Sequence, residues 1–237
     1  MMLIGRASRA SGHRGMELRF GQATWPSAVV AGVVGSVLLV GCSASTGDAV
    51  GESDLSPSMP HSIASSVVRQ TDEAGRQLPF QTAFPNRWSA NNDGSPYEPC
   101  TALSEDMLLR AGMVPASAMD AAVADGQTAR GCVWRVGSGH KGTISQIVGN
   151  LTDPQDGLTG YKRLNSSGIE WFADTRVDGR TVAVGSSSSA HCLAVVQSQR
   201  AIVATIARMV ALDRPPVPQI CERAIAFTRA TIDQIPR

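Results

Sequence analysis

The side chains best suited to covalent chemistry in this sequence are five cysteines. A cysteine thiol can close a disulfide, take part in a redox cycle, bind zinc or carry a lipid. The sequence contains no C-x-x-C motif, so a thioredoxin-like redox centre is not indicated. His140 and His191 do not stand at zinc-ligand spacing from paired cysteines, so no metal site and no cofactor is predicted. The cysteines are Cys42, Cys100, Cys132, Cys192 and Cys221.

Cys42 closes a short apolar segment near the start of the chain. This segment, Ala28 to Val40, is too short for the roughly 20 residues of a spanning helix but suits the apolar core of a signal peptide. Four arginines and a single acidic residue precede it. Residues Leu39 to Cys42 resemble a bacterial lipobox, which implies cleavage before Cys42 and a diacylglyceryl group on its thiol. The alternative is a cysteine that happens to follow a secretory segment. With the acyl chains in place, the chain would be stably anchored to a membrane.

The other four cysteines are even in number, which in an exported chain indicates two disulfides. Three pairings are possible. We favour Cys100–Cys132 and Cys192–Cys221, because each pair closes a local loop of about 30 residues. A C-terminal helix would also point Cys221 inward, toward Cys192 on a central strand.

One glycine-rich loop imitates two enzyme motifs. Ser138 and Lys141 have the spacing of the S-x-x-K nucleophile motif of penicillin-binding proteins, but that chemistry needs a serine at the start of a helix. Ser89 imitates the second motif of those enzymes in the wrong order. Residues Gly137 to Gly142 match G-x-G-x-x-G, but β-branched residues follow where a dinucleotide site needs a helix. We therefore predict a hairpin loop.

The serine-rich run Gly185 to His191 does not match the G-x-S-x-G nucleophile motif, and we predict a mobile loop between strands. His191 and Cys192 are neighbours on a predicted strand, so their side chains point to opposite faces and do not form a Cys–His pair. Trp134 and Trp171 are either core residues or a wall that faces a lipid or peptide; we favour the core. No catalytic residue is predicted.

The composition narrows the class of protein. A length of 237 residues suits one domain and a tail. The formal net charge is +1, and no basic stripe with interleaved aromatic residues occurs, so a nucleic-acid partner is not indicated. Lysine is rare while arginine, alanine and glycine are common, which is typical of a genome rich in G and C.

The sequence pattern predicts an α+β domain: an antiparallel sheet of about five or six strands, disulfide-bonded and covered on one face by an N-terminal and a C-terminal helix. The first helix begins after a cap at Ser104 and stops at Gly112. The last begins at Pro218 and runs to about Gln234. A weaker helix is predicted over residues 153–163, and strands in CVWRV, TISQIVGNL, IEWFAD and VDGRTVAVG and on both sides of a turn at 197–200.

These elements divide the chain into three parts. Residues 1–41 are the predicted lipoprotein signal peptide, with either Met1 or Met16 as the start. Residues 42–78 begin with small, polar, proline- and glycine-bearing sequence and are predicted to be a flexible tether. Residues 79–237 are predicted to form a single α+β domain.

Four segments, YEPCTALSEDMLLRAG, GCVWRV, AHCLAVV and ICERAIAF, resemble a family of actinobacterial, mainly mycobacterial, lipoproteins. Its domain is catalogued as domain of unknown function 3558. The resemblance covers about residues 78 to 235 and rests on the four cysteines of these segments and on Trp134. It implies a cell-envelope lipoprotein with a disulfide-bonded domain, and it brings no catalytic residues.

We therefore expect an exported, lipid-anchored cell-envelope protein on the extracytoplasmic side of the membrane, in a periplasm-like space or the cell wall. It would act as a non-enzymatic binding module for another envelope protein or a glycan. The alternative is a carrier of a hydrophobic ligand such as an envelope lipid, which predicts a deep apolar cavity between the sheet and the helices. A hydrolytic enzyme would need a cleft lined by catalytic polar groups, and no motif in this sequence indicates such groups.

Overall fold

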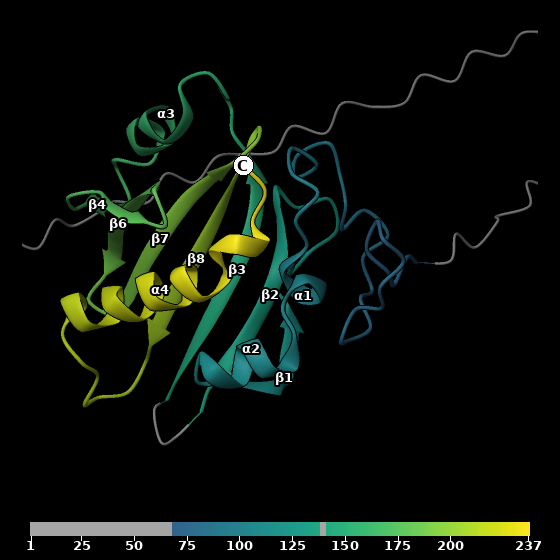
Figure 1. Cartoon of the computed structure of the whole chain (residues 1–237), viewed down its shortest axis with the longest axis horizontal. Coiled ribbons are helices and arrows are strands. Elements are labelled where there is room, and N and C mark those ends of the chain that lie inside the picture. The colour runs from purple at the N-terminus through teal and green to yellow at the C-terminus, as the bar shows by residue number, and fades with distance from the viewer. Residues whose placement is uncertain (1–67, 138–140) are drawn as a thin grey trace, which may run out of the picture. The chain divides into compact units, whose positions relative to one another are not determined.

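The computed structural model describes residues 68–137 and 141–237 (Figure 1). The predicted signal peptide, Cys42 and residues 43–67 of the predicted tether lie outside the described residues, as do residues 138–140 of the glycine-rich loop. The described residues belong to one compact unit. Within the two described ranges, no helix has the length and apolar character needed to cross a membrane.

An antiparallel sheet of eight strands forms the centre of the domain. Seven strands follow the order β1-β2-β3-β8-β7-β6-β4, and β5 pairs with β6 outside this path. Tight turns join β5 to β6 and β7 to β8, where Asp178 and Gln199 adopt positive φ angles of 47° and 53°. The strands are β1 (Met113–Asp120), β2 (Ala129–Val136), β3 (Gly142–Asn150), β4 (Glu170–Trp171), β5 (Thr175–Val177), β6 (Arg180–Ser188), β7 (His191–Ser198) and β8 (Ala201–Met209).

Local sequence explains where the helices begin and end. The Ser104 side chain accepts a hydrogen bond from the Met107 backbone N–H at 3.2 Å, and Gly112 follows the helix with a φ of 77°, as the cap prediction required. Pro218 lies in the first turn of the C-terminal helix. Backbone N–H groups there have no partner within the helix, so the missing N–H of proline removes no helical hydrogen bond. The helices are α1 (Pro99–Ala102), α2 (Glu105–Arg110), α3 (Gly157–Leu164) and α4 (Val217–Thr231), with a 3₁₀ turn at Ile232–Gln234.

The predicted fold class, a sheet of five or six strands covered on one face by N- and C-terminal helices, is wrong. The sheet has eight strands, and helices lie against both of its faces. The sequence does not predict β1, because Pro115 and small residues obscure its alternation and its register shifts between Val114 and Met119. Proline and irregular pairing are tolerated there because β1 is an edge strand.

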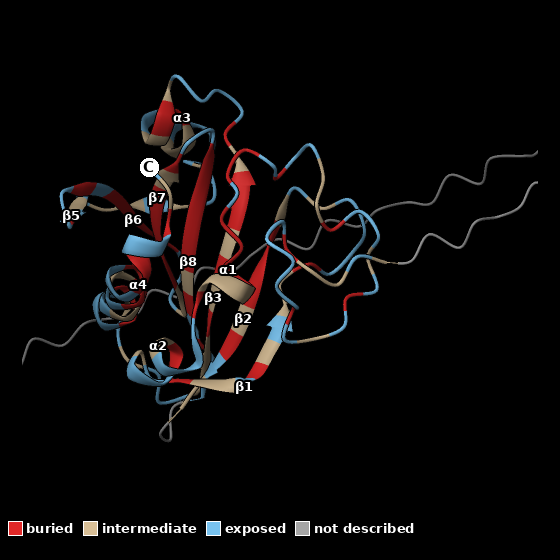
Figure 2. Ribbon diagram, turned by 45° about the vertical axis from the view of Figure 1, so that its right-hand side comes forward, coloured by how far each residue is buried: buried red, intermediate tan, exposed pale blue. Residues whose placement is uncertain are grey.

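The two apolar faces follow from the alternation of side chains along β7. Cys192 and Ala194 belong to the cluster under α4, whereas Leu193 and Val195 belong to a second cluster with α3 residues. Figure 2 shows β7 and β8 buried along most of their length. A strand that is apolar at consecutive positions needs cover on both sides, and α3 supplies the second cover.

Each disulfide ties a helix to a strand. Cys100 of α1 is bonded to Cys132 of β2, and Cys192 of β7 is bonded to Cys221 of α4. The favoured pairing is therefore confirmed. Both disulfides and both apolar clusters are made among the described residues of 68–237.

An irregular segment before α1 is attached to the sheet through a buried ion cluster. The Arg87 side chain has no exposed area, and its guanidinium donates to Glu98 at 2.7 Å and to Asp120 at 3.0 Å. It also donates to the Gly131 carbonyl at 3.1 Å and lies 3.3 Å from the Cys100 sulfur. Through these contacts, the Arg87 side chain links the irregular segment to α1, β1 and β2, next to the disulfide that Cys100 forms.

Contacts of the domain also involve residues before the predicted boundary at 79. The Gln70 side chain exchanges two hydrogen bonds of 2.9 Å with the backbone of Thr82. The Thr101 hydroxyl of α1 donates to the Asp72 carboxylate at 2.5 Å, and Leu78 is part of the cluster under α4. Residues 70–78 are thus bonded to the domain.

Candidate functional site

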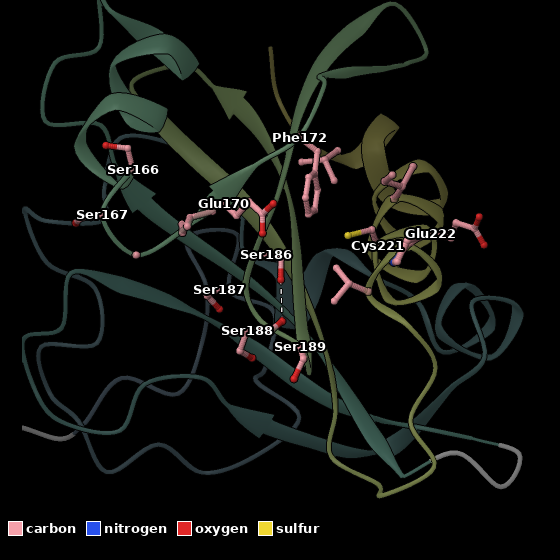
Figure 3. A pocket seen from close by; sticks show the side chains of 16 residues that line it. Ser166, Ser167, Glu170, Phe172, Ser186, Ser187, Ser188, Ser189, Cys221 and Glu222 are labelled. Atoms are coloured by element: carbon pink, nitrogen blue, oxygen red, sulfur yellow. Dashed lines mark hydrogen bonds between the residues drawn. The ribbon is translucent and has the colours of Figure 1, made fainter. Parts of the chain in front are cut away.

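A groove of about 940 Å³ lies between the sheet and α4 (Figure 3). Its sheet side is formed by β4, the serine-rich end of β6 and the turn that precedes β4, and its helix side by the first turns of α4. The lining residues are Ser166, Ser167, Gly168, Ile169, Glu170, Phe172, Val184, Ser186, Ser187, Ser188, Ser189, Val217, Pro218, Cys221, Glu222 and Ile225.

The floor of the groove is apolar. Val217, Cys221 and Ile225 are spaced four residues apart on α4, so they form one stripe along the helix. Phe172 faces this stripe across the groove (Figure 3), and Val184 of β6 lines the same hollow. This stripe lies at the margin of the face that packs on the sheet, because Cys221 is bonded to Cys192 in the core while Val217 and Ile225 are half-buried. The groove therefore runs beside the core and not beneath the helix.

The core beneath α4 is closed. Ile220 and Ala224 have no exposed area, and the rings of Trp134 and Phe227 pack 5.7 Å apart between β2 and the helix. The deep cavity between sheet and helices that a carrier of a hydrophobic ligand would need is therefore not found at this place. A ligand in the groove would lie along the edge of the core.

Serines form the rim of the groove on the β6 side. The Ser186 hydroxyl lies 2.7 Å from the Ser188 carbonyl and 2.8 Å from the His191 carbonyl, so its hydrogen is used to hold the irregular turn between β6 and β7. Ser187, Ser188 and Ser189 are exposed. Their hydroxyls therefore remain open to solvent and to a ligand, although each also contacts a neighbouring group. The mobile loop predicted over Gly185 to His191 corresponds to a strand end and a tight turn.

Two carboxylates supply the only formal charges in the lining. Glu170 stands on β4 and Glu222 on α4, so they lie on opposite walls, and both are exposed. No lysine, arginine or histidine is among the residues that line the groove. A ligand would therefore combine an apolar part, for the floor, with neutral or cationic polar groups at the rim.

Most residues of the imitated enzyme motifs lie away from this groove. Ser138 and His140 are outside the described residues, Lys141 is exposed just before β3, and Ser89 lies in the irregular segment before α1. The strands on either side of the glycine-rich loop pair antiparallel, from Ala129↔Gly149 to Arg135↔Thr143. The predicted hairpin is confirmed, and no helix start follows the loop to receive a pyrophosphate.

His191 pairs with a serine and not with its neighbour Cys192. Its Nδ1 lies 3.3 Å from the Ser187 hydroxyl, and burial and then the charge of Arg208 lower its pKa below the ordinary histidine value. Cys192 is bonded to Cys221. Among the hydrogen bonds of residues 68–137 and 141–237, none joins the other ring nitrogen of His191 to a carboxylate. The pair thus lacks the third member that orients a catalytic histidine.

Trp134 belongs to the core, as favoured, whereas Trp171 is half-buried and packs against the second apolar cluster. Trp134 is 1% exposed. Trp171 lies at the second face, where its ring is 6.0 Å from that of Tyr161 and its indole N–H donates to the Lys162 carbonyl of α3. Neither ring lines the groove. In the part of the chain that the structure describes, no group of three histidine, cysteine or acidic side chains could hold a metal ion.

Sequence reasoning missed the groove. Phe172 and Ile225 are half-buried against the core cluster and also line the groove, and Glu170 and Glu222 are isolated acids of a kind that is common on surfaces. The available signal was the four-residue spacing of Val217, Cys221 and Ile225, which forms an apolar stripe at the margin of the packed face of α4.

Comparison with known proteins agrees with the resemblance drawn from the cysteine segments. The family described as "Protein of unknown function (DUF3558)" matches residues 37–234, which is most of the chain. No curated protein and no solved structure matches the chain. Lipid attachment and an actinobacterial source stay predictions. The chain belongs to the DUF3558 family.

Proposed function

We propose that this chain is an exported, lipid-anchored cell-envelope protein and that its domain is a non-enzymatic binding module whose ligand occupies the groove. One observation supports the proposal that the domain binds a ligand: the groove of about 940 Å³ has an apolar floor bounded by exposed hydroxyls and two carboxylates. Ligand sites commonly have this size and this mixture of apolar walls and few polar groups. The signal-like segment before Cys42 and the two disulfides support export.

The partner that fits best is an exposed segment of another envelope protein, with an apolar side chain for the floor and neutral or basic groups for the rim. A glycan would use the serine hydroxyls but would gain little from the apolar stripe of α4. The open rim, formed by Ser187, Ser188 and Glu222, admits a ligand that is itself part of a larger molecule.

A hydrophobic carrier is the second candidate, because Phe172, Val184 and Ile225 would also accept a lipid chain. Native mass spectrometry separates the two candidates. The chain from Ser43 is expressed with export into an actinobacterial envelope and its native mass is recorded. A discrete additional mass that extracts into chloroform would identify a carrier. A bare polypeptide with two disulfides is expected for the binding module, and crosslinking in cells would then identify its partner.

Ile225→Arg is expected to block the groove. Ile225 is half-buried on α4 and faces the apolar floor, so the larger cation fills the site while its charge remains near solvent. The neutral dye N-phenyl-1-naphthylamine is the probe, and its affinity should fall at least about tenfold, or about 1.4 kcal/mol. Gln219→Arg places the same side chain on an exposed position of α4 outside the groove and is the control. Equal dye binding by both variants would place the apolar site elsewhere.

Cys42→Ala is expected to release the protein from the membrane fraction or leave its signal peptide uncleaved, because the acceptor for the diacylglyceryl group is lost. The measurement is membrane fractionation with incorporation of a labelled fatty acid. Ser43→Ala changes the adjacent position without removing a thiol and should behave as the unaltered chain. Normal membrane retention and labelling of the Cys42→Ala chain would contradict the anchor.

A further inference from the structure

The loop that joins β8 to α4, residues 210–216, exposes two large apolar side chains at one end of the sheet (Figure 1). Leu212 is 104% exposed and Val210 is 58% exposed. A turn bond from the Arg214 N–H to the Ala211 carbonyl shapes the loop, and Pro215 and Pro216 restrict its backbone. The fold therefore holds these side chains in solvent on a constrained turn, where burial in the core does not stabilise them.

Three cations surround this apolar tip. The Val210 N–H donates to the Lys141 carbonyl at 3.3 Å, and the exposed Arg208 stands on β8 two residues before Val210. Arg214 donates to the Ser189 carbonyl at 3.1 Å and to the Ser189 hydroxyl at 2.8 Å, which are both neutral acceptors. Within residues 68–137 and 141–237, none of the three cations forms an ion pair.

Apolar and basic groups also share one hollow. Lys141 and residues 209–215 enclose about 460 Å³ of space, and Asp213 is the only acidic residue in its lining. Exposed aliphatic side chains beside cations that form no ion pair are complementary to an anionic bilayer, where the apolar groups enter the interface and the cations lie against lipid phosphates.

We propose that this loop is a membrane contact of the folded domain, in which Leu212 and Val210 enter the headgroup region of an anionic bilayer and Lys141, Arg208 and Arg214 lie against lipid phosphates. The contact goes beyond the proposed function and needs neither a groove ligand nor a lipid on Cys42. It would set the orientation of the domain on the membrane. Because Ser189, Val217 and Pro218 line the groove and adjoin this loop, the groove would then open next to the bilayer.

The test uses the chain from Ser43, which carries no anchor, and its sedimentation with vesicles. Vesicles of phosphatidylglycerol and phosphatidylcholine are compared with vesicles of phosphatidylcholine alone. Binding to the anionic vesicles is expected to weaken with salt. It should fall at least about tenfold in a chain with both Leu212→Ser and Val210→Ser, and about fivefold when Lys141→Gln removes one cation.

Matched controls lie outside the hollow formed by Lys141 and residues 209–215. Leu164→Ser removes an apolar side chain that is 57% exposed at the end of α3, and Arg200→Gln removes an exposed cation at the start of β8. Both should bind anionic vesicles as the unaltered chain does, and near-ultraviolet circular dichroism checks that every variant is folded. Three results would each overturn the proposal: no binding to anionic vesicles, equal binding to neutral vesicles, or unchanged binding by the doubly substituted chain.

Discussion

Replacing Arg87 by methionine is expected to lower the free energy of unfolding by about 3–5 kcal/mol. The guanidinium is the partner of Glu98 and Asp120, whose side chains are only 2% and 11% exposed. Methionine fills much of the same volume but leaves these carboxylates without their main cation, and uncompensated buried charge is costly. Urea unfolding measures the effect as a lower midpoint with an unchanged m-value.

Arg76→Met is the matched control for this prediction. Arg76 also contacts a carboxylate, that of Asp72, at 2.7 Å, but its side chain is 53% exposed. The Asp72 side chain is only 3% exposed, but it would keep the Thr101 hydroxyl and the Arg76 backbone N–H as donors, so the loss should be only about 1 kcal/mol. Arg87→Lys keeps the charge but cannot reach both carboxylates with a planar fork, so it should fall between the unaltered chain and Arg87→Met. Losses of similar size at positions 76 and 87 would contradict the assigned role of the cluster.

Removing the second disulfide with Cys192→Ser and Cys221→Ser is expected to lower the free energy of unfolding by about 3–4 kcal/mol. The disulfide spans 29 residues of sequence and ties α4 to the central strand β7. Cys221 also lines the groove, so the folded fraction of this variant should bind the apolar dye less tightly. Denaturant unfolding and dye titration measure the two effects separately.

Cys100→Ser with Cys132→Ser provides the comparison, since this disulfide closes a loop of similar length, 32 residues, away from the groove. Stability should fall by a similar amount while dye binding by the folded fraction is kept. Cys192→Ser alone should leave Cys221 open to alkylation. A non-reduced peptide map that links Cys100 to Cys192 would refute the pairing.

Features set by neighbouring residues could be predicted from the sequence. The cap at Ser104, the stop at Gly112 and the turn between β7 and β8 depend on groups only a few residues apart, and the structure has all three. The disulfide pairing was also accessible, because each bond closes a local loop and Cys221 falls on the inward side of an amphipathic helix. The predicted signal segment and the predicted lipid attachment at Cys42 rest on the sequence alone.

Features that join distant segments were decided only by tertiary structure. Nothing in the sequence around Arg87 distinguishes it from the other arginines. It is buried and links several segments only because folding brings Glu98, Asp120 and Gly131 into contact with it from three other segments. The groove likewise exists because the edge of the sheet at β4 and β6 ends next to α4. Side-chain periodicity predicts which side of an element is apolar, but it does not specify which other element covers that side. This is why the second cover, by α3, and the groove beside Val217 and Ile225 appear only when the chain is folded.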